Sequence, residues 1–261
     1  MSGNDKTSSQ NTFCLTHIRV ALALLTRLPL PHPPFDASKP AAHAAWAYPL
    51  VGVVIASLNL GLTLSAIWLG LPVSLATLLG LLGGIMCTGA MHEDGLADCA
   101  DGFWGGWTSE RRLEIMKDSQ IGTYGVLVLL VSIGLRWQAL TLLMEAEAFL
   151  PIIAAAVASR SAMVWVMYSL PNARHSGLSH HTGQPQSQHT IAAIGIGLIA
   201  ILLSQSVPFF TTALVVATVT FGCAQLSRTK IGGQTGDVIG ATQQVVEIAV
   251  LLVCLAAVNS A

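Results

Sequence analysis

The sequence has 261 residues, of which 53% are hydrophobic and only 10% are charged, whereas an ordinary soluble domain carries about 25% charged residues. The net charge of −1 excludes the basic excess of a nucleic-acid-binding protein, and the mean hydropathy of +0.66 excludes a disordered chain. We therefore expect an all-α, polytopic integral membrane protein that has the lipid bilayer as its surroundings and no nucleic acid as a partner.

The chain begins with a polar stretch, residues 1–12, that predicts a disordered tail. We expect residues 13–261 to form a single transmembrane domain. No signal peptide is expected, because the first apolar run begins late and no small-residue cleavage site follows a basic lead. That run, Phe13–Leu28, is short, carries Arg19 and Arg27, and ends at a Pro-Leu-Pro sequence. It predicts an amphipathic or re-entrant helix that lies against the membrane face.

Seven later runs have the 17–25 apolar residues that a helix needs to cross the hydrocarbon core of a bilayer. The fifth of them is short for a separate span. We therefore expect about seven transmembrane helices, at Ala44–Trp68, Pro72–Met91, Tyr124–Met144, Phe149–Tyr168, Thr190–Val207, Phe209–Leu226 and Val238–Val258.

The basic residues predict the orientation of these spans. With a cytoplasmic N-terminus, the inner segments contain ten of the twelve Lys and Arg residues, and the outer loops contain none. The other two, Arg136 and Arg160, lie inside spans. Membrane proteins keep an excess of Lys and Arg on the cytoplasmic side. We therefore expect a multi-pass membrane protein whose polar segments, including residues 92–123, face the cytoplasm.

The densest polar stretch follows the second span. Asp94, Asp98 and Asp101 are spaced so that they share one face of a helix. Three carboxylates on one face repel each other unless a cation neutralises them, and oxygen ligands favour Mg²⁺. The three aspartates are therefore candidate metal ligands and catalytic residues, and Gly95 and Gly102 would let a ligand or another backbone approach closely. The alternative is a solvated acidic face at a helix end.

A second polar segment ends in Lys117-Asp118, just before the third span. Ser109 is placed to cap a helix over 110–118, and a surface helix explains most of this segment. A basic residue beside an acidic one close to a metal cluster also suits phosphate handling. Lys117 and Asp118 are therefore candidate catalytic residues, with a solvated surface helix as the alternative.

A glycine-rich loop precedes the last span. Backbone N–H groups in such a loop can bind oxyanions, so Gly233, Gln234, Thr235 and Asp237 are candidate substrate-binding residues. The alternative for Asp237 is that it caps the last helix.

Two arginines lie within apolar spans, where a charged side chain is costly unless it meets a carboxylate or a water-filled cavity. Arg160 is therefore a candidate for binding an anionic group, and Arg136 is expected to pair with a carboxylate that the sequence does not identify. The histidines between Asn172 and His189 could bind zinc, but a solvated loop explains them better.

The chain resembles the cobalamin synthase family, the adenosylcobinamide-GDP ribazoletransferases of vitamin B12 assembly. The resemblance covers nearly the whole chain from about residue 13. It departs from the family at Gln243-Gln244, where the family often carries Glu, whereas Glu247 is kept. The matching stretches are Thr26–Pro31, Tyr48–Gly52, His92–Gly102, Met116–Gly125, Ser159-Arg160 and Gly232–Ala241.

The resemblance implies a reaction. A hydroxyl of α-ribazole, or of its 5′-phosphate, attacks a phosphoryl group of adenosylcobinamide-GDP, and GMP leaves. It also implies an integral, multi-pass transferase of the bacterial inner membrane that needs Mg²⁺. Asp94, Asp98 and Asp101 would hold this ion, and one of them, by preference Asp101, would instead act as a base. A homo-oligomer, or association with other cobalamin-assembly enzymes, stays open.

Three other functions remain open at this stage. Asp98-x-x-Asp101-Gly102 resembles the start of the CDP-alcohol phosphotransferase motif, but the following Ala-Arg is replaced by Gly105-Gly106. The aspartate spacing of membrane prenyltransferases is reversed here. A cation transporter would place ionisable groups near mid-membrane, in repeated halves. The sequence shows no such repeat.

Overall fold

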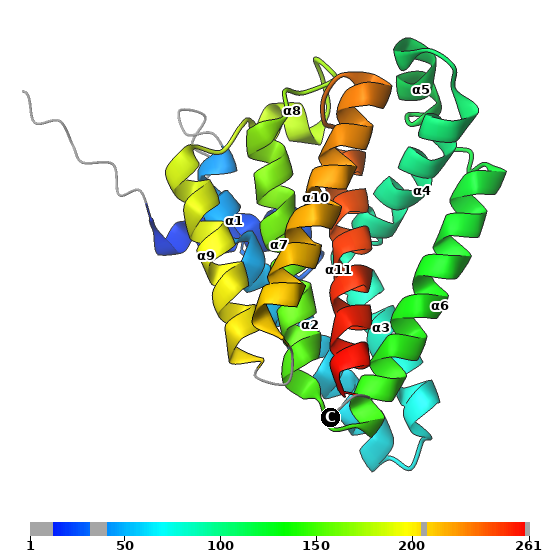
Figure 1. Cartoon of the computed structure of the whole chain (residues 1–261), viewed down its shortest axis with the longest axis vertical. Helices are drawn as coiled ribbons and strands as arrows, with labels where there is room; N and C mark the ends of the chain where they lie inside the picture. Colours follow the sequence, from blue (N-terminus) through cyan, green and yellow to red (C-terminus); the bar gives the residue numbers. More distant parts are fainter. Residues whose placement is uncertain (1–12, 32–40, 205–207, 259–261) are drawn as a thin grey trace, which may run out of the picture.

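The structure, a computed structural model, describes residues 13–31, 41–204 and 208–258, and the predicted tail at 1–12 lies outside these ranges. The described residues fold into a helical bundle, as the composition predicts (Figure 1). Its elements are α1 (Leu15–Leu25), η1 (Ala41–Ala47), α2 (Tyr48–Trp68), α3 (Val73–Thr88), α4 (Met91–Gly105), α5 (Ser109–Ile115), α6 (Thr123–Glu145), α7 (Phe149–Ser169), α8 (Leu178–Thr182), α9 (Ser187–Leu203), α10 (Phe209–Ile231) and α11 (Gly236–Val258).

Each of the seven predicted spans contains a helix, although residues 205–207, at the end of the fifth, lie outside the described ranges. Within the described residues, five helices are long and apolar enough to cross a membrane, and a sixth is obtained only if α3 and α4 count as one bent span. The five are η1 with α2, α6, α7, α10 and α11. The fifth predicted span, now α9, has 17 described residues, a length of about 26 Å at 1.5 Å per residue. The helix is thus at the lower limit of the 17–25 residues that cross a bilayer, and it is not counted among the five.

The second predicted span breaks where the backbone leaves the right-handed helical region. Gly89 and Ala90 both have positive φ, 65° and 56°, and α4 departs from α3 at an angle of 84°. Glycine adopts this conformation readily, whereas alanine does so at a cost. The helix that carries the predicted aspartates is therefore a separate element from α3, and it is not one of the five helices that are long and apolar enough to cross a membrane.

The centre of the bundle is formed by α7 and α11, which are the most buried of the five long helices. Small side chains on α7 allow its neighbours to approach closely: a side chain at Gly52 of α2 would lie 2.5 Å from the carbonyl oxygen of Ala156. Helices in membranes commonly pack through small residues in this way. At the edge of the bundle, α1 packs on η1 and α2, burying Ala21 and Leu25 and exposing Arg19, as an amphipathic helix does.

The placement of α4 depends on three glycines. A Cβ on Gly95 would lie 2.7 Å from the carbonyl oxygen of Asp237 in α11, and one on Gly240 would lie 3.1 Å from the Cα of His92. A Cβ on Gly102 would lie 2.4 Å from the side chain of Met116, next to α5. The close approach that we predicted at Gly95 and Gly102 is therefore an approach of protein to protein, and it fixes α4 against α11.

Candidate active site

The predicted site residues lie at one end of the bundle. The second half of α4, helices α5 and α8, the start of α6 and the loop between α10 and α11 all lie there (Figure 1). Two long-range contacts hold this end together: Arg112 donates to the carbonyl oxygen of Lys230 at 2.9 Å, and Lys230 donates to that of Phe103 at 3.0 Å. The three polar segments of the sequence therefore come together.

The aspartates of α4 do not share one environment. Asp94 is exposed, Asp98 is half-buried and Asp101 is buried. The carboxylate of Asp101 accepts hydrogen bonds from the backbone N–H groups of Gly122, at 2.7 Å, and Gly125, at 2.9 Å. It therefore satisfies free donors at the beginning of α6. Because both oxygens of Asp101 are occupied by these donors, this residue anchors the loop between α5 and α6.

Asp98 lies close enough to other carboxylates to be perturbed by them. Partial burial, followed by the charges of Asp237 and Asp94, raises the pKa of Asp98 to about 7, and the nearby Arg174 opposes this shift. Mutual repulsion among carboxylates is the pattern that a bound cation would reverse. Asp94, Asp98 and Asp237 therefore form the acidic face of the site.

Arg174 supplies the positive charge beside this acidic face. Its guanidinium donates to Asp237 at 3.0 Å and to the carbonyl oxygen of Leu113 at 3.2 Å. Both side chains of the ion pair are partly exposed, Arg174 by 16% and Asp237 by 22%. The sequence did not predict a role for Arg174, because this residue lies in a loop far along the chain from the last helix, and only the folded structure brings the two together.

The glycine-rich loop is used mainly for contacts within the protein. Gln234 accepts from Ser179 at 2.7 Å and donates to Asn172 at 2.7 Å, and its backbone N–H donates to the carbonyl oxygen of Pro171. A side chain on Gly233 would lie 2.3 Å from that same oxygen. These contacts join the α7–α8 segment to the α10–α11 loop.

The residue that caps α11 is Thr235. Its hydroxyl accepts from the backbone N–H of Val238 at 3.3 Å and donates to Asp237 at 3.2 Å. Asp237 lies in the first turn of α11, where a negative charge also favours the helix dipole. The alternative that Asp237 itself is the cap is therefore not what the structure shows.

Lys117 and Asp118 are both exposed, and Asp118 accepts from the backbone N–H of Gln120 at 3.1 Å. The preceding helix is shorter than we predicted: α5 ends at Ile115, and its cap is Thr108, which accepts from Arg111 at 3.2 Å. Asp118 therefore stabilises a turn, and Lys117 is free of the packed interior.

A cluster of buried charges lies deeper in the bundle. Arg136 of α6 donates to Glu93 of α4 at 2.7 Å and contacts Glu247 of α11 at 3.2 Å. Arg160 of α7 lies 3.7 Å from Glu247 and donates to the carbonyl oxygen of Ala156 at 2.9 Å. The unnamed partner that we expected for Arg136 is thus a pair of glutamates. Arg160, with its side chain 3% exposed, lies within the protein interior.

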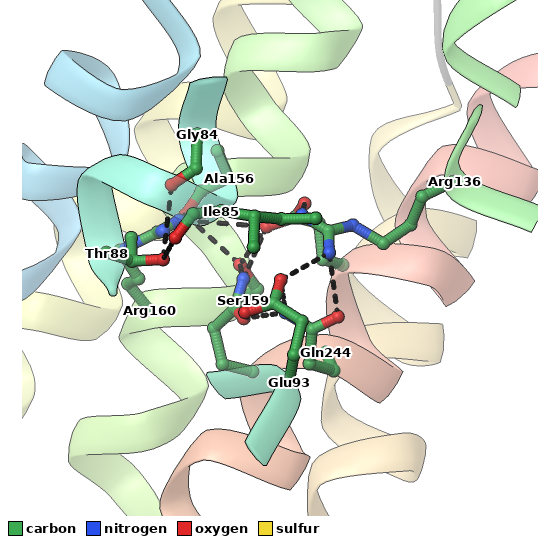
Figure 2. Close-up of polar contacts among 11 residues, drawn as sticks. Gly84, Ile85, Thr88, Glu93, Arg136, Ala156, Ser159, Arg160 and Gln244 are labelled. Atoms are coloured by element: carbon green, nitrogen blue, oxygen red, sulfur yellow. Dashed lines mark hydrogen bonds and ion pairs between the residues drawn. The ribbon is translucent and has the colours of Figure 1, made fainter. Parts of the chain in front are cut away.

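Two glutamines complete this cluster, part of which is drawn in Figure 2. Gln244 donates to Glu93 at 3.0 Å and accepts from Arg136 at 2.9 Å, while Gln243 donates to Glu247 and to Ser159. The place where the family often carries Glu is therefore occupied by amides inside the ion-pair cluster. The two arginines and two glutamates balance in charge.

The acidic face suits a Mg²⁺ ion that takes only a few of its ligands from the protein. Among residues 13–31, 41–204 and 208–258, no group of three His, Cys, Asp or Glu side chains converges on one point. Mg²⁺ often takes one or two carboxylates and completes its shell with water and substrate phosphate. The oxygen donors of Asp94 and Asp98 match that requirement, whereas Asp101 is committed to two backbone N–H groups.

The fold and the site define a polytopic helical membrane protein with an acidic, phosphate-compatible face at one end of its bundle. The sequence profile of the cobalamin-5-phosphate synthase family matches residues 17–255. The chain belongs to that family.

Curated relatives match along almost their full length. An adenosylcobinamide-GDP ribazoletransferase of Mesorhizobium japonicum is 39% identical over 94% of this chain and 95% of its own. A protein of the same name from Brucella anthropi is 41% identical over 88% and 93% of the two chains, and one from Bradyrhizobium diazoefficiens is 39% identical over 93% and 94%. No solved structure matches.

Proposed function

We propose that this protein is an adenosylcobinamide-GDP ribazoletransferase that acts in cobalamin biosynthesis. The observation that carries the proposal is the extent of the family match, which runs over residues 17–255 and so includes every candidate site residue. The full-length relatives bear this activity in their names. The geometry supports it independently, because carboxylates and an arginine meet at one end of the bundle, as phosphoryl transfer requires.

The reaction transfers a phosphoryl group between two substrates. A hydroxyl oxygen of α-ribazole, or of its 5′-phosphate, forms a bond to the phosphorus on the cobinamide side of the diphosphate. The bond from that phosphorus to the oxygen that joins the two phosphates breaks, and GMP leaves with the electron pair. The hydroxyl proton passes to a carboxylate of the acidic face.

The residues at the site take distinct roles in this proposal. Asp94 and Asp98 would hold Mg²⁺, which supplies charge neutralisation of the diphosphate when it is bound. Arg174 and the exposed Lys117 bind phosphate oxygens, and the Arg174–Asp237 ion pair orients the guanidinium. Asp101 holds the loop before α6 through its two backbone contacts and is not our candidate base.

In this proposal, four of the residues first considered for substrate or catalysis have a structural role. Arg160 lies in the buried ion-pair cluster, Gly233 and Gln234 join two loops, and Asp118 stabilises a turn. Thr235 caps α11 and also donates to Asp237, so its contribution to the site passes through that carboxylate.

We place the protein in the bacterial inner membrane with this site on the cytoplasmic face. Support comes from the basic residues at the site end of the bundle, since cytoplasmic segments are enriched in Lys and Arg. The residues are Arg111, Arg112, Lys117, Arg174, Arg228 and Lys230.

The test uses the full chain in lipid vesicles. Adenosylcobinamide-GDP and α-ribazole are added with and without Mg²⁺, and GMP and the cobalamin product are measured by mass spectrometry. We expect both products in equal amounts, only with Mg²⁺, and a loss of turnover in the Asp98→Asn variant. A well-folded chain that releases no GMP with either α-ribazole or its 5′-phosphate would overturn the proposal.

One observation favours examining a cation transporter in the same preparation. Arg136, Arg160 and Glu247 lie near the middles of α6, α7 and α11, and mid-membrane charges are typical of transport pathways. These charges pair with one another, which favours a structural role. Uptake of a divalent cation by the same vesicles, with no GMP release, would support the transporter instead.

A further inference from the structure

Helix α4 begins with a buried carboxylate that is held by charge. Glu93, 7% exposed, accepts from Arg136 at 2.7 Å and from Gln244 at 3.0 Å (Figure 2). The next residue along the chain is Asp94, the first carboxylate of the acidic face. The hydrogen bonds that fix Glu93 therefore restrain the residue directly before a proposed metal ligand.

The start of α4 has little other support from the chain before it. The break at Gly89 and Ala90 means that α4 is not a continuation of α3, and Ala90 has the unfavourable left-handed conformation. Farther along, Gly95 packs on the backbone of Asp237, and Asp101 is anchored at the beginning of α6. Contacts at Glu93, Gly95 and Asp101 thus secure α4, and Asp94 and Asp98 lie between them.

Arg136 is the side chain that joins the two buried glutamates. It contacts Glu93 on α4 and Glu247 on α11, whereas Arg160 lies beside Glu247. A buried carboxylate that loses its cation is left with a large desolvation penalty, so it moves, takes up water or becomes protonated. Among the residues that the structure describes, the amide of Gln244 is then the remaining hydrogen-bond donor to Glu93.

We propose that Arg136 is a positioning residue: by holding Glu93 it fixes the first turn of α4, and so keeps Asp94 and Asp98 beside Asp237 where they bind the divalent cation. This proposal rests on the proposed function for its reaction but not for its main readout, which is cation binding. Residues that orient metal ligands from outside the coordination shell typically contribute about 10–100-fold to metal affinity.

Mn²⁺ serves as the probe, because it takes the same oxygen ligands as Mg²⁺ and is detected by electron paramagnetic resonance. Its binding to the full chain in detergent is measured for the unaltered protein, Arg136→Gln and Arg136→Lys. The Mg²⁺ concentration for half-maximal GMP release is measured for the same proteins. We expect Arg136→Gln to weaken Mn²⁺ binding by about tenfold or more, with a parallel rise in the Mg²⁺ requirement. Arg136→Lys should fall between the two.

A matched control lies on the same helix. Thr141 of α6 shares a buried hydrogen bond of 2.7 Å with Thr77 of α3, away from α4. Thr141→Val removes a buried polar contact of α6 without touching Glu93. It should leave Mn²⁺ binding unchanged, even if it lowers the melting temperature, and this separates positioning from general stability.

The outcomes divide cleanly. Monodisperse Arg136→Gln protein that binds Mn²⁺ as the unaltered chain does would overturn the proposal. If that variant does not fold, Arg136→Lys decides, and unchanged Mn²⁺ binding by it overturns the proposal. Absence of Mn²⁺ binding to the unaltered chain would overturn it as well. Normal Mn²⁺ behaviour without any GMP release would refute the proposed reaction alone and leave the positioning role standing.

Discussion

The contact between Gly95 and the backbone of Asp237 allows a quantitative test of how α4 is placed. In Gly95→Ala, the new Cβ would lie 2.7 Å from the Asp237 carbonyl oxygen and 2.9 Å from its Cα. Both neighbours are main-chain atoms, so no flexible side chain can turn aside. An ordinary contact begins at 3.4 Å, so the two helices must separate by about 0.7 Å.

Two energies oppose each other in this variant. Alanine favours a helix interior over glycine by about 1 kcal/mol, while over-packing costs about 1–3 kcal/mol. We therefore expect a net destabilisation of up to about 2 kcal/mol. Because a displacement of about 1 Å near the reacting groups can cost about 100-fold in rate, the 0.7 Å separation should lower turnover by about tenfold or more.

Two further glycine-to-alanine variants of the same chain serve for comparison with Gly95→Ala. Gly134 of α6 has no neighbouring atom within 4 Å of a new Cβ, so Gly134→Ala should retain full turnover and should not lower the melting temperature. Gly240→Ala, with contacts of 3.1 Å and 3.2 Å, should be intermediate. Turnover is measured as GMP release, and stability as thermal unfolding in detergent. If Gly95→Ala matched Gly134→Ala in both measurements, the packing argument would be refuted.

Three other variants test separate parts of the site end. Asp101→Asn should lose one of two charge-assisted hydrogen bonds to backbone N–H groups and destabilise the chain by about 1.5–3 kcal/mol. The loop before α6 should then become sensitive to proteases, and a loop that stays resistant would contradict this. Gln234→Leu removes the contacts to Ser179 and Asn172 and should lower the free energy of unfolding by about 1–3 kcal/mol, measured by thermal unfolding. The control, Gln184→Leu, changes an exposed residue and should not lower it by that amount. The pKa of Asp98 is raised in the folded chain to about 7, so the native state binds more protons than the unfolded state. The stability of the chain without Mg²⁺ should therefore fall as the pH rises from about 4 to about 7. Asp98→Asn should lessen this pH dependence, and an unchanged slope would exclude Asp98 as its source.

The sequence was sufficient for the helices and insufficient for their breaks. Apolar runs located every long helix, because burial in lipid requires continuous apolar stretches. The break after α3 went unpredicted, since a single Gly-Ala pair within an apolar run does not show that both residues have positive φ. The shortness of α9 was indicated by its run, and the helix end at Leu203 fixes its length at 17 residues.

For the site, the spacing of the aspartates predicted that they share a helix, but it did not predict which residues they contact. Asp94, Asp98 and Asp101 do lie on one helix, as their spacing indicates. The loop that returns to Asp101 supplies its N–H groups from 21 and 24 residues away, and Arg136 meets Glu93 across 43 residues. Such pairings depend on how helices pack, which local periodicity does not contain. An arginine inside a span signalled a missing carboxylate but could not identify it.

The buried charges also impose an order on how the chain can be made. During synthesis Glu93 precedes Arg136, so this pair can form once α6 has entered the bilayer. Arg160 on α7 precedes its carboxylate, Glu247 on α11, by 87 residues, and a lone arginine at the centre of a helix costs about 2.5–3.5 kcal/mol to insert. A nascent chain that stops before α11 carries that cost without relief. The last helix is therefore the element that completes insertion, and chains truncated before it should be cleared by membrane proteases.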